Sequence, residues 1–213
     1  MMIDDLLLGI KVVFFDADGC ILDSSKANRM VHEMLTGRVP SESLRNSVKG
    51  LNHYEAWKII CKEYKLKETP EEIIKRREEM MQSIYPELPL KEGVEEFLEE
   101  LRERNIQYCI TASCNKEHLF QKLLGHKDIL NNAKIIVTNE SDVQPKPSSD
   151  LFLKALRSLP GISPVDVLVV DDSVKGIQAA LNCNMHTLLI SSSEKNEIPQ
   201  TLMLNSLLQL KSH

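Results

Sequence analysis

The sequence predicts an α/β fold in which a parallel sheet is interrupted by an all-helical insertion. From residue 91 onward, short apolar runs alternate with amphipathic helical segments, as in right-handed βαβ units. Between residues 26 and 88 the patterns are helical throughout, and no strand pattern occurs. We therefore expect an α/β core made of residues 1–25 and 89–213, with residues 26–88 as a separate helical domain.

The first strand is predicted at Val12–Phe15, where four β-branched or aromatic residues follow one another, as in a strand buried on both faces. In the insertion, Thr69 followed by Pro70 and two glutamates is a helix start signal. The helices expected there span Lys26–Leu35, Ser41–Val48, Asn52–Tyr64 and about 69–84.

The second part of the chain is expected to alternate between helices and short strands. The helices are predicted at Val94–Arg104, Lys116–Leu124, Ser149–Ser158 and Val174–Leu181. The strands are predicted at Gln107–Thr111, Lys134–Thr138, Val167–Val170 and Thr187–Ile190. The segment Ser191–Pro199 is expected to be a polar loop, followed by a terminal leucine-rich helix.

The composition of the chain limits the partners and the cellular location that we expect. The 213 residues carry a formal net charge of −5 and include no polybasic stretch, so nucleic acid and anionic membranes are not expected as partners. No apolar run approaches the roughly 18 residues of a membrane span. The five cysteines lack C-x-x-C spacing, and the N-terminus lacks a signal-peptide pattern, which favours reduced thiols and a cytoplasmic location. We expect a monomer or a weak dimer.

Acidic residues follow the first strand directly. Asp16 and Asp18 stand at the end of a buried strand, where charge is costly unless something pairs with it. A divalent metal is the natural partner, and carboxylates that bind a hard cation can also attack phosphorus. The loop from Asp16 to Ser24 is therefore a candidate phosphoryl-transfer centre.

Three further strand ends carry reactive side chains. Ligands of an open parallel sheet bind beyond the carboxyl ends of its strands. Thr111 ends the second strand, Lys146 lies between two prolines after the third, and Asp171 with Asp172 ends the fourth. A hydroxyl, a lysine and a second acidic pair are thus expected to converge on Asp16.

These segments resemble, in order, the four motifs of the haloacid dehalogenase-like superfamily. They are Asp-x-Asp-Gly-x-x-x-Asp-Ser from Asp16, the segment around Thr111, Lys-Pro-x-x-Asp-x-Phe from Lys146, and Asp-Asp-Ser-x-x-Gly-Ile-x-Ala-Ala from Asp171. The last motif and the helical insertion are most similar to the β-phosphoglucomutase-like phosphatases. The resemblance covers essentially the whole chain. It implies a Rossmann-like parallel-sheet core with a small helical cap domain inserted after the first strand.

The resemblance also implies the roles of the acidic residues. Asp16 would be the nucleophile that forms an aspartyl-phosphate, which splits one difficult displacement into two easier steps. Asp18 would protonate the leaving oxygen and later deprotonate water, and its main-chain carbonyl would bind metal. Asp172, with Asp171, would complete the oxygen ligands of Mg²⁺.

Binding residues are implied in the same way. Thr111 would donate a hydrogen bond to the phosphoryl group, and Lys146 would hold this group and neutralise the carboxylates. Ser113 and Asn115 are further binding candidates near a predicted helix start. In the cap, Lys49 and His53 occupy a loop that carries substrate-contacting residues in the mutase-like subgroup.

Two positions depart from the mutase pattern. His53 stands where arginine is expected, and Asn28 stands where the mutase uses a histidine at the cap hinge. The departures argue against a sugar-phosphate mutase and leave phosphatase chemistry intact. We therefore expect a Mg²⁺-dependent phosphatase that acts on a small phosphorylated metabolite. A mutase of the β-phosphoglucomutase type and a non-catalytic binder of phosphorylated ligands remain alternatives.

Each motif taken alone has a simpler explanation. Asp-x-Asp-Gly occurs in side-chain-capped turns, and an acidic pair followed by serine can merely cap the next helix. Lys146 could be a solvated loop residue, and Thr111 could satisfy a strand end. Their occurrence at four successive strand ends favours the catalytic interpretation. Haloacid dehalogenation is less favoured, because it needs no Mg²⁺ and those enzymes usually lack the acid that Asp18 supplies.

Overall fold

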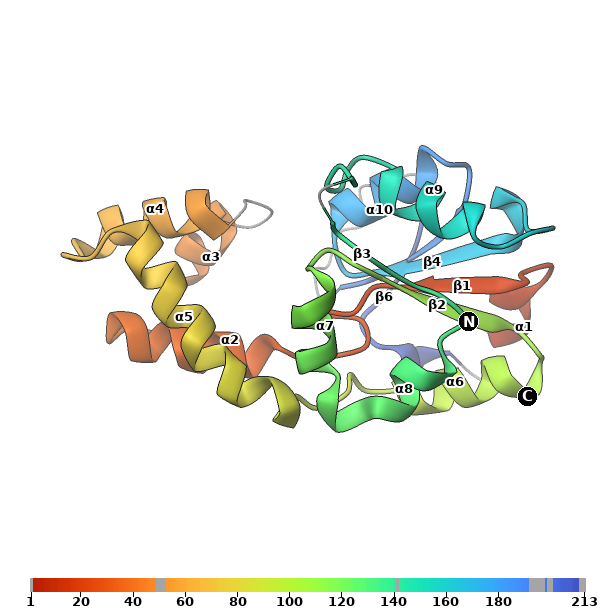
Figure 1. The fold of residues 1–213 in the computed structure, drawn as a ribbon, viewed down its shortest axis with the longest axis horizontal. Coiled ribbons are helices and arrows are strands. Elements are labelled where there is room, and N and C mark those ends of the chain that lie inside the picture. Colours follow the sequence, from red (N-terminus) through yellow and green to blue (C-terminus); the bar gives the residue numbers. More distant parts are fainter. Residues whose placement is uncertain (1, 49–52, 141, 192–197, 199–200, 211–213) are drawn as a thin grey trace. The chain divides into compact units, whose positions relative to one another are not determined.

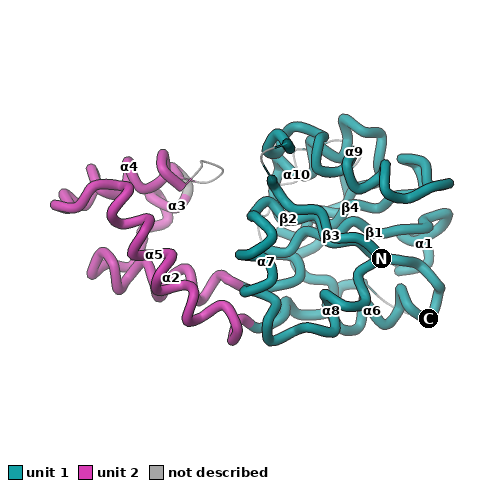
Figure 2. The backbone as a smooth tube through the Cα atoms, in the orientation of Figure 1, with its two compact units in different colours: residues 1–23, 89–213 teal, residues 24–88 magenta. Residues whose placement is uncertain are grey.

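The computed structural model describes residues 2–48, 53–140, 142–191, 198 and 201–210. The chain forms two compact units (Figure 2), one made of residues 1–23 with 89–213 and the other of residues 24–88. Among the described residues, every strand belongs to the first unit, which we call the core unit. The second, which we call the helical unit, contains helices and their connections.

The core unit is built on a six-stranded parallel sheet with the order β3-β2-β1-β4-β5-β6. In β1, Val12 pairs with Gln107 of β2 on one side and with Val167 of β4 on the other. The chain runs outward from β1 to β3 and then returns to β4, so the strand order reverses beside β1. A ligand site is expected at the carboxyl ends of the strands at this reversal. The strands are β1 (Val12–Phe15), β2 (Gln107–Ala112), β3 (Ile136–Thr138), β4 (Val167–Asp171), β5 (His186–Ile190) and β6 (Leu202–Leu204).

Helices cover both faces of this sheet (Figure 1). On one face, Phe14 stacks on Phe152 of α9 at 6.3 Å between ring centroids. On the other face, Phe15 meets Phe97 of α6 edge-on at 5.9 Å. Consecutive residues of a strand point to opposite faces, so β1 is buried on both sides, as its apolar run predicts. The helices are α1 (Ile3–Leu7), α6 (Val94–Glu103), α7 (Lys116–Lys122), α8 (Lys127–Asn132), α9 (Asp150–Arg157) and α10 (Val174–Leu181).

The helical unit packs around a small apolar interior that includes Trp57, Ile73 and Met81. Its longest helix begins at Thr69 with a capping box, in which Thr69 and Glu72 each accept a hydrogen bond from the other's backbone N–H. The helices are α2 (Ser25–Thr36), α3 (Glu42–Val48), α4 (His53–Tyr64) and α5 (Pro70–Ile84), followed by a short 3₁₀ turn at Tyr85–Glu87.

Most predicted elements are confirmed, but the prediction of a terminal leucine-rich helix is wrong. Residues Leu202–Leu204 form β6, which pairs in parallel with β5, and only a 3₁₀ turn follows at Leu207–Gln209. An edge strand has unpaired backbone groups, and pairing with them outweighs the helix preference of the leucines. Helices α1 and α8 were not predicted.

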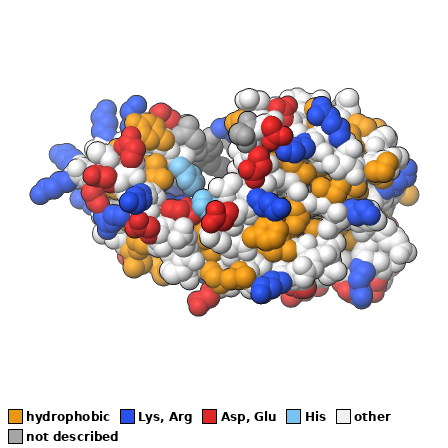
Figure 3. All heavy atoms as spheres, in the orientation of Figure 1, with side chains coloured by type: hydrophobic (Ala, Val, Ile, Leu, Met, Phe, Trp, Pro, Cys, Tyr) orange, Lys and Arg blue, Asp and Glu red, His pale blue; other side chains and the backbone are white. Residues whose placement is uncertain are grey.

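The charged side chains on the surface are mixed in sign (Figure 3), as expected from a sequence without a polybasic stretch. Acidic and basic side chains are intermixed on the face shown in Figure 3, without a large field of one sign. Within the described part of the chain, no helix is both long enough and apolar enough to cross a membrane.

Candidate active site

Lys146 joins two buried carboxylates at the carboxyl ends of β1 and β4. Its Nζ lies 2.7 Å from Oδ1 of Asp16 and 2.6 Å from Oδ2 of Asp171. Asp16 follows β1, and its backbone N–H donates to the carbonyl of Val170 on the adjacent strand at 2.9 Å. The structure therefore brings together three of the predicted site residues from segments far apart in the sequence.

The charges in this cluster are strongly coupled. Burial raises the pKa of Asp16, Lys146 opposes the shift, and the charges of Asp171 and Asp172 add to it. Burial also disfavours the charge of Lys146, but Asp16 and Asp171 outweigh it and raise the pKa of the ammonium group. Lys146 thus remains protonated, and its positive charge compensates part of the buried negative charge.

Asp172 lies against the loop that follows Asp16. Gly19 in this loop has a φ of +80°, and a Cβ there would lie 2.0 Å from Oδ2 of Asp172. Desolvation and the neighbouring charge of Asp171 raise the pKa of Asp172 to about 6, although its side chain keeps contact with solvent. The close approach explains why glycine is required at position 19.

Asp171 uses both carboxylate oxygens within the protein. Its Oδ2 accepts from Lys146, and its Oδ1 accepts from the backbone N–H and the hydroxyl of Ser173 at 2.9 and 2.7 Å. Ser173 in turn caps α10, because its Oγ accepts from the N–H of Gly176 at 3.0 Å. Asp171 therefore connects the start of α10 to Lys146.

Thr111 lies one residue beyond the paired residues Phe15 and Ile110, so it continues the ladder next to Asp16. It is fully buried, and no hydrogen-bond partner of its Oγ1 is found within the described residues. Leaving a buried hydroxyl without a hydrogen-bond partner costs free energy of folding, and a bound ligand could supply that partner.

The other two candidates of this region lie after β2. Ser113 is exposed, and Asn115 caps α7 by accepting a hydrogen bond from the N–H of His118 at 2.9 Å.

Of the two candidate residues in the helical unit, Lys49 and His53, the structure describes only His53. Lys49 lies outside the described residues. His53 is exposed at the start of α4. Asn28 is exposed on α2 and its amide oxygen accepts from Arg77 of α5 at 2.6 Å, so it contributes to packing within the helical unit.

We next ask whether the oxygen atoms of this site could bind a metal ion. Across the described chain, no three His, Cys, Asp or Glu side chains are grouped in a way that could hold an ion. Because both oxygens of Asp171 already accept hydrogen bonds, we take the carboxylates of Asp16 and Asp172 with the main-chain carbonyl of Asp18 as the set to test. Such a set of few protein oxygens fits Mg²⁺, which usually keeps several waters. Burial and the charges of neighbouring carboxylates raise the pKa of Asp16 and of Asp172, and a bound cation would offset both effects.

A contact that the sequence analysis missed involves Asp18. Lys122 of α7 donates from Nζ to Oδ2 of Asp18 at 2.7 Å. The sequence contains many lysines on helices, and no motif distinguishes Lys122 from them. Only the packing of α7 within the core unit brings Lys122 to Asp18.

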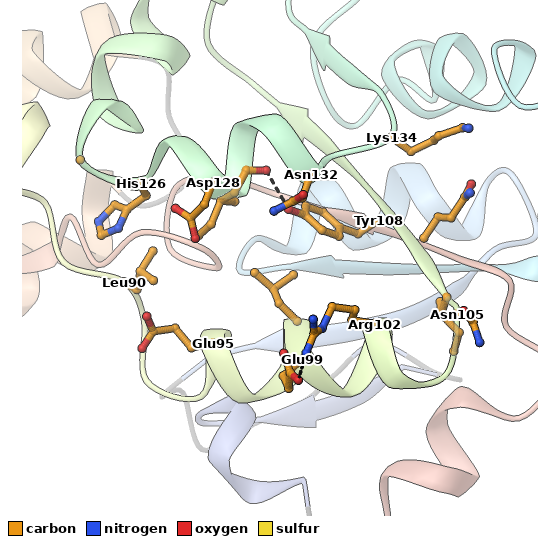
Figure 4. Close-up of a pocket in the computed structure, with 15 residues that line it drawn as sticks. Leu90, Glu95, Glu99, Arg102, Asn105, Tyr108, His126, Asp128, Asn132 and Lys134 are labelled. Carbon is orange, nitrogen blue, oxygen red and sulfur yellow. Dashed lines mark hydrogen bonds and ion pairs between the residues drawn. The ribbon is translucent and has the colours of Figure 1, made fainter.

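A separate groove of about 920 Å³ lies in the core unit between α6 and α8 (Figure 4). Its lining includes Tyr108, whose hydroxyl donates to the carbonyl of Ile129 at 2.7 Å, and the Glu99–Arg102 ion pair. None of the predicted site residues lines this groove.

Residues 13–190 match the family described as haloacid dehalogenase-like hydrolase. The chain belongs to this family. The hydrolase is 29% identical over 188 residues to a (DL)-glycerol-3-phosphatase of Arabidopsis thaliana, covering 84% of the hydrolase and 78% of the relative. It is 28% identical over 199 residues to a phosphoglycolate phosphatase of Nitrosospira multiformis, covering 86% and 84% of the two chains.

Solved structures share the fold of the hydrolase. A family IA hydrolase of Entamoeba histolytica superposes with a TM-score of 0.77 at 20% identity, over 95% of this chain and 96% of the other. A β-phosphoglucomutase of Clostridium difficile gives 0.71 at 21% identity, over 95% and 93%. A Bacillus subtilis hydrolase bound to magnesium gives 0.76 at 15% identity, over 94% and 96%.

Proposed function

We propose that this hydrolase is a Mg²⁺-dependent phosphatase that cleaves a small phosphorylated metabolite through an aspartyl-phosphate. The observation that carries the proposal is the position of Lys146, whose ammonium group contacts both Asp16 and Asp171 at the carboxyl ends of the strands. A buried, protonated lysine beside a buried carboxylate is suited to bind a phosphoryl group at the point where that carboxylate can attack it.

In the first half-reaction, a carboxylate oxygen of Asp16 attacks phosphorus and the bond to the leaving oxygen breaks. Asp18 donates a proton to this oxygen, so that an alcohol departs. Lys146 and the hydroxyl of Thr111 donate to the oxygens of the phosphoryl group. In this role the buried hydroxyl of Thr111 gains the partner that it lacks within the described residues.

In the second half-reaction, water attacks the phosphorus of the aspartyl-phosphate. Asp18, now a carboxylate, takes the proton from this water, and the bond from phosphorus to Asp16 breaks. Inorganic phosphate leaves and Asp16 returns to its initial state. The same two acids thus complete the cycle without a net change in the enzyme.

Asp16, Asp172 and the main-chain carbonyl of Asp18 would hold the Mg²⁺. The cation, when bound, offsets the repulsion between the Asp16 carboxylate and the phosphoryl anion. We assign Asp171 to holding Lys146 and the start of α10, because both of its oxygens accept hydrogen bonds there.

The helical unit is proposed to act as a cap that determines the substrate and excludes bulk water during the reaction. Lys49 and His53 are its proposed substrate-contacting residues. The two named relatives act on small phosphorylated compounds, which supports the proposed substrate class. Asn28 offers no support for the mutase alternative, since its side chain is engaged with Arg77.

The test is a panel of phosphate esters that includes glycerol 3-phosphate, phosphoglycolate, a sugar phosphate and an aryl phosphate. We expect release of phosphate that needs added Mg²⁺ and is lost on chelation. Asp16→Asn should abolish turnover, whereas Asp142→Asn, which removes an exposed carboxylate paired with Lys154, should leave it unchanged. Turnover by the Asp16→Asn variant would exclude Asp16 as the nucleophile.

The panel also separates the alternatives. Conversion of the sugar phosphate to its isomer, without release of phosphate, would support a mutase. Saturable binding of a phosphate ester without turnover would support a non-catalytic binder and exclude the proposed function.

A further inference from the structure

The starting point is the ion pair between Lys122 and Asp18, both in the core unit. Lys122 lies in the last turn of α7, next to Leu123, and the side chains of Leu119 and Leu123 are fully buried. The first turn of the helix is capped by Asn115. The helix is thus held at its start and along its buried side, and it presents the ammonium group of Lys122 from a fixed position.

The backbone of Asp18 is fixed, but its side chain is not buried. The turn around it is closed by hydrogen bonds from Leu22 to the carbonyl of Ala17 and from Gly19 to the carbonyl of Leu22, both at 2.9 Å. The side chain of Asp18 is 43% exposed, whereas that of Lys122 is 12% exposed. An exposed aspartate can turn about two side-chain bonds, so a donor held on a packed helix restricts it.

Lys146 and Lys122 therefore contact different aspartates. Lys146 contacts Asp16 and Asp171. Lys122 contacts Asp18 through one oxygen, Oδ2, at 2.7 Å. This contact restrains the carboxylate of Asp18 through Oδ2.

We propose that Lys122 is the positioning residue that orients Asp18 for proton transfer to the leaving oxygen. The proposal rests on the proposed function, in which Asp18 is the general acid. It implies that Lys122 matters most for substrates whose leaving oxygen must be protonated as it departs. An alkoxide leaving group depends on this proton, whereas a nitrophenolate departs readily without it.

The test compares kcat/KM for glycerol 3-phosphate, or the best alkyl phosphate of the panel, with kcat/KM for p-nitrophenyl phosphate. For Lys122→Met we expect a loss of about 10- to 100-fold with the alkyl ester and of less than about 3-fold with the aryl ester. Lys122→Arg, which keeps a donor, should recover part of the alkyl activity. The ratio of the two kcat/KM values does not depend on the fraction of folded enzyme, so the test holds if Lys122→Met is unstable.

Two controls separate positioning from a general effect. Lys127→Met removes an exposed lysine from the neighbouring helix α8 and should change neither value. In an Asp18→Asn background, Lys122→Met should have little additional effect on the residual turnover of the alkyl ester, because the residue it positions is absent.

Equal losses with both esters, or full additivity with Asp18→Asn, would overturn the positioning role. Absence of any Mg²⁺-dependent turnover by the unmodified chain would instead contradict the proposed function. The two failures are therefore distinguishable.

Discussion

A Cβ atom at Gly176 would lie 2.0 Å from Oδ2 of Asp171, the same oxygen that accepts a hydrogen bond from Lys146. The first turn of α10 therefore packs directly on the carboxylate that holds the lysine, and only glycine leaves room for it. The requirement here is one of space, since Gly176 lies within a helix and its backbone needs no unusual φ.

Gly176→Ala should therefore displace Asp171 and, through it, Lys146. We expect a loss of about 1–3 kcal/mol in the free energy of unfolding from overpacking, although alanine favours helix more than glycine does. Because Lys146 is displaced, Gly176→Ala should also lower the rate of phosphate release. Urea unfolding and the phosphatase assay measure the two effects. Gln178→Ala, at an exposed position of the same helix, should alter neither.

Lys146→Met should be strongly destabilising, because it leaves the buried carboxylates of Asp16 and Asp171 without their cation. Removal of one partner of a buried ion pair typically costs about 3–5 kcal/mol. The exposed pair of Lys154 and Asp142 provides the comparison, and Lys154→Met should cost less than about 1 kcal/mol. Similar losses from both variants in urea unfolding would contradict the assigned burial of the Lys146 cluster.

Gly19→Ala should weaken Mg²⁺ binding as well as stability. The added Cβ meets the carboxylate of Asp172 at 2.0 Å, and the residue also has a φ of +80°. Gly161 has the same φ with nothing within 4 Å of the corresponding Cβ, so Gly161→Ala isolates the backbone strain, about 1–2 kcal/mol.

We expect both variants to lose stability, and only Gly19→Ala to need a higher Mg²⁺ concentration for half-maximal activity. A Mg²⁺ titration of the two variants decides this. An unchanged requirement in Gly19→Ala would remove Asp172 from the proposed metal ligands.

Asp166 should titrate at a lower pH than an ordinary aspartate. The hydroxyl and backbone N–H of Ser163 donate to its Oδ2 at 2.6 and 2.8 Å, and Lys11 pairs with its Oδ1 at 2.9 Å. These contacts lower the pKa of Asp166 from 3.8 to about 2. A lowered pKa in the folded state stabilises the protein above pH 3.8, and this contribution disappears as the pH falls from 3.8 toward 2.

An NMR titration of the Asp166 carboxyl carbon measures this pKa directly. Ser163→Ala removes the hydroxyl donor and should move the midpoint upward. A midpoint near 3.8 in the unmodified protein would show that these contacts do not hold in solution.

Local sequence features predict much of the architecture. The apolar run at Val12–Phe15 predicts β1, because a strand buried on both faces has no polar side. The Thr69 signal predicts the start of α5, since a capping box depends on residues three positions apart. The order of the four motifs predicts that Asp16, Lys146 and Asp171 meet, because parallel strands place their carboxyl ends at one edge of the sheet.

The C-terminal segment shows where local features are insufficient. Leucines favour a helix by intrinsic propensity, yet Leu202–Leu204 forms a strand beside β5. The deciding factor is the unpaired edge of a sheet whose other strands lie elsewhere in the chain.

The amino-acid sequence alone determined the family, the α/β core and the candidate acids of the proposed chemistry, since burial patterns and motif order depend on neighbouring residues and on strand direction. Tertiary structure decided which contacts these acids make. It engages both oxygens of Asp171 within the protein, places Asp172 against Gly19, and brings Lys122 to Asp18 across 104 positions of the chain. Such contacts depend on how helices pack on the sheet, and spacing along the chain does not specify that packing.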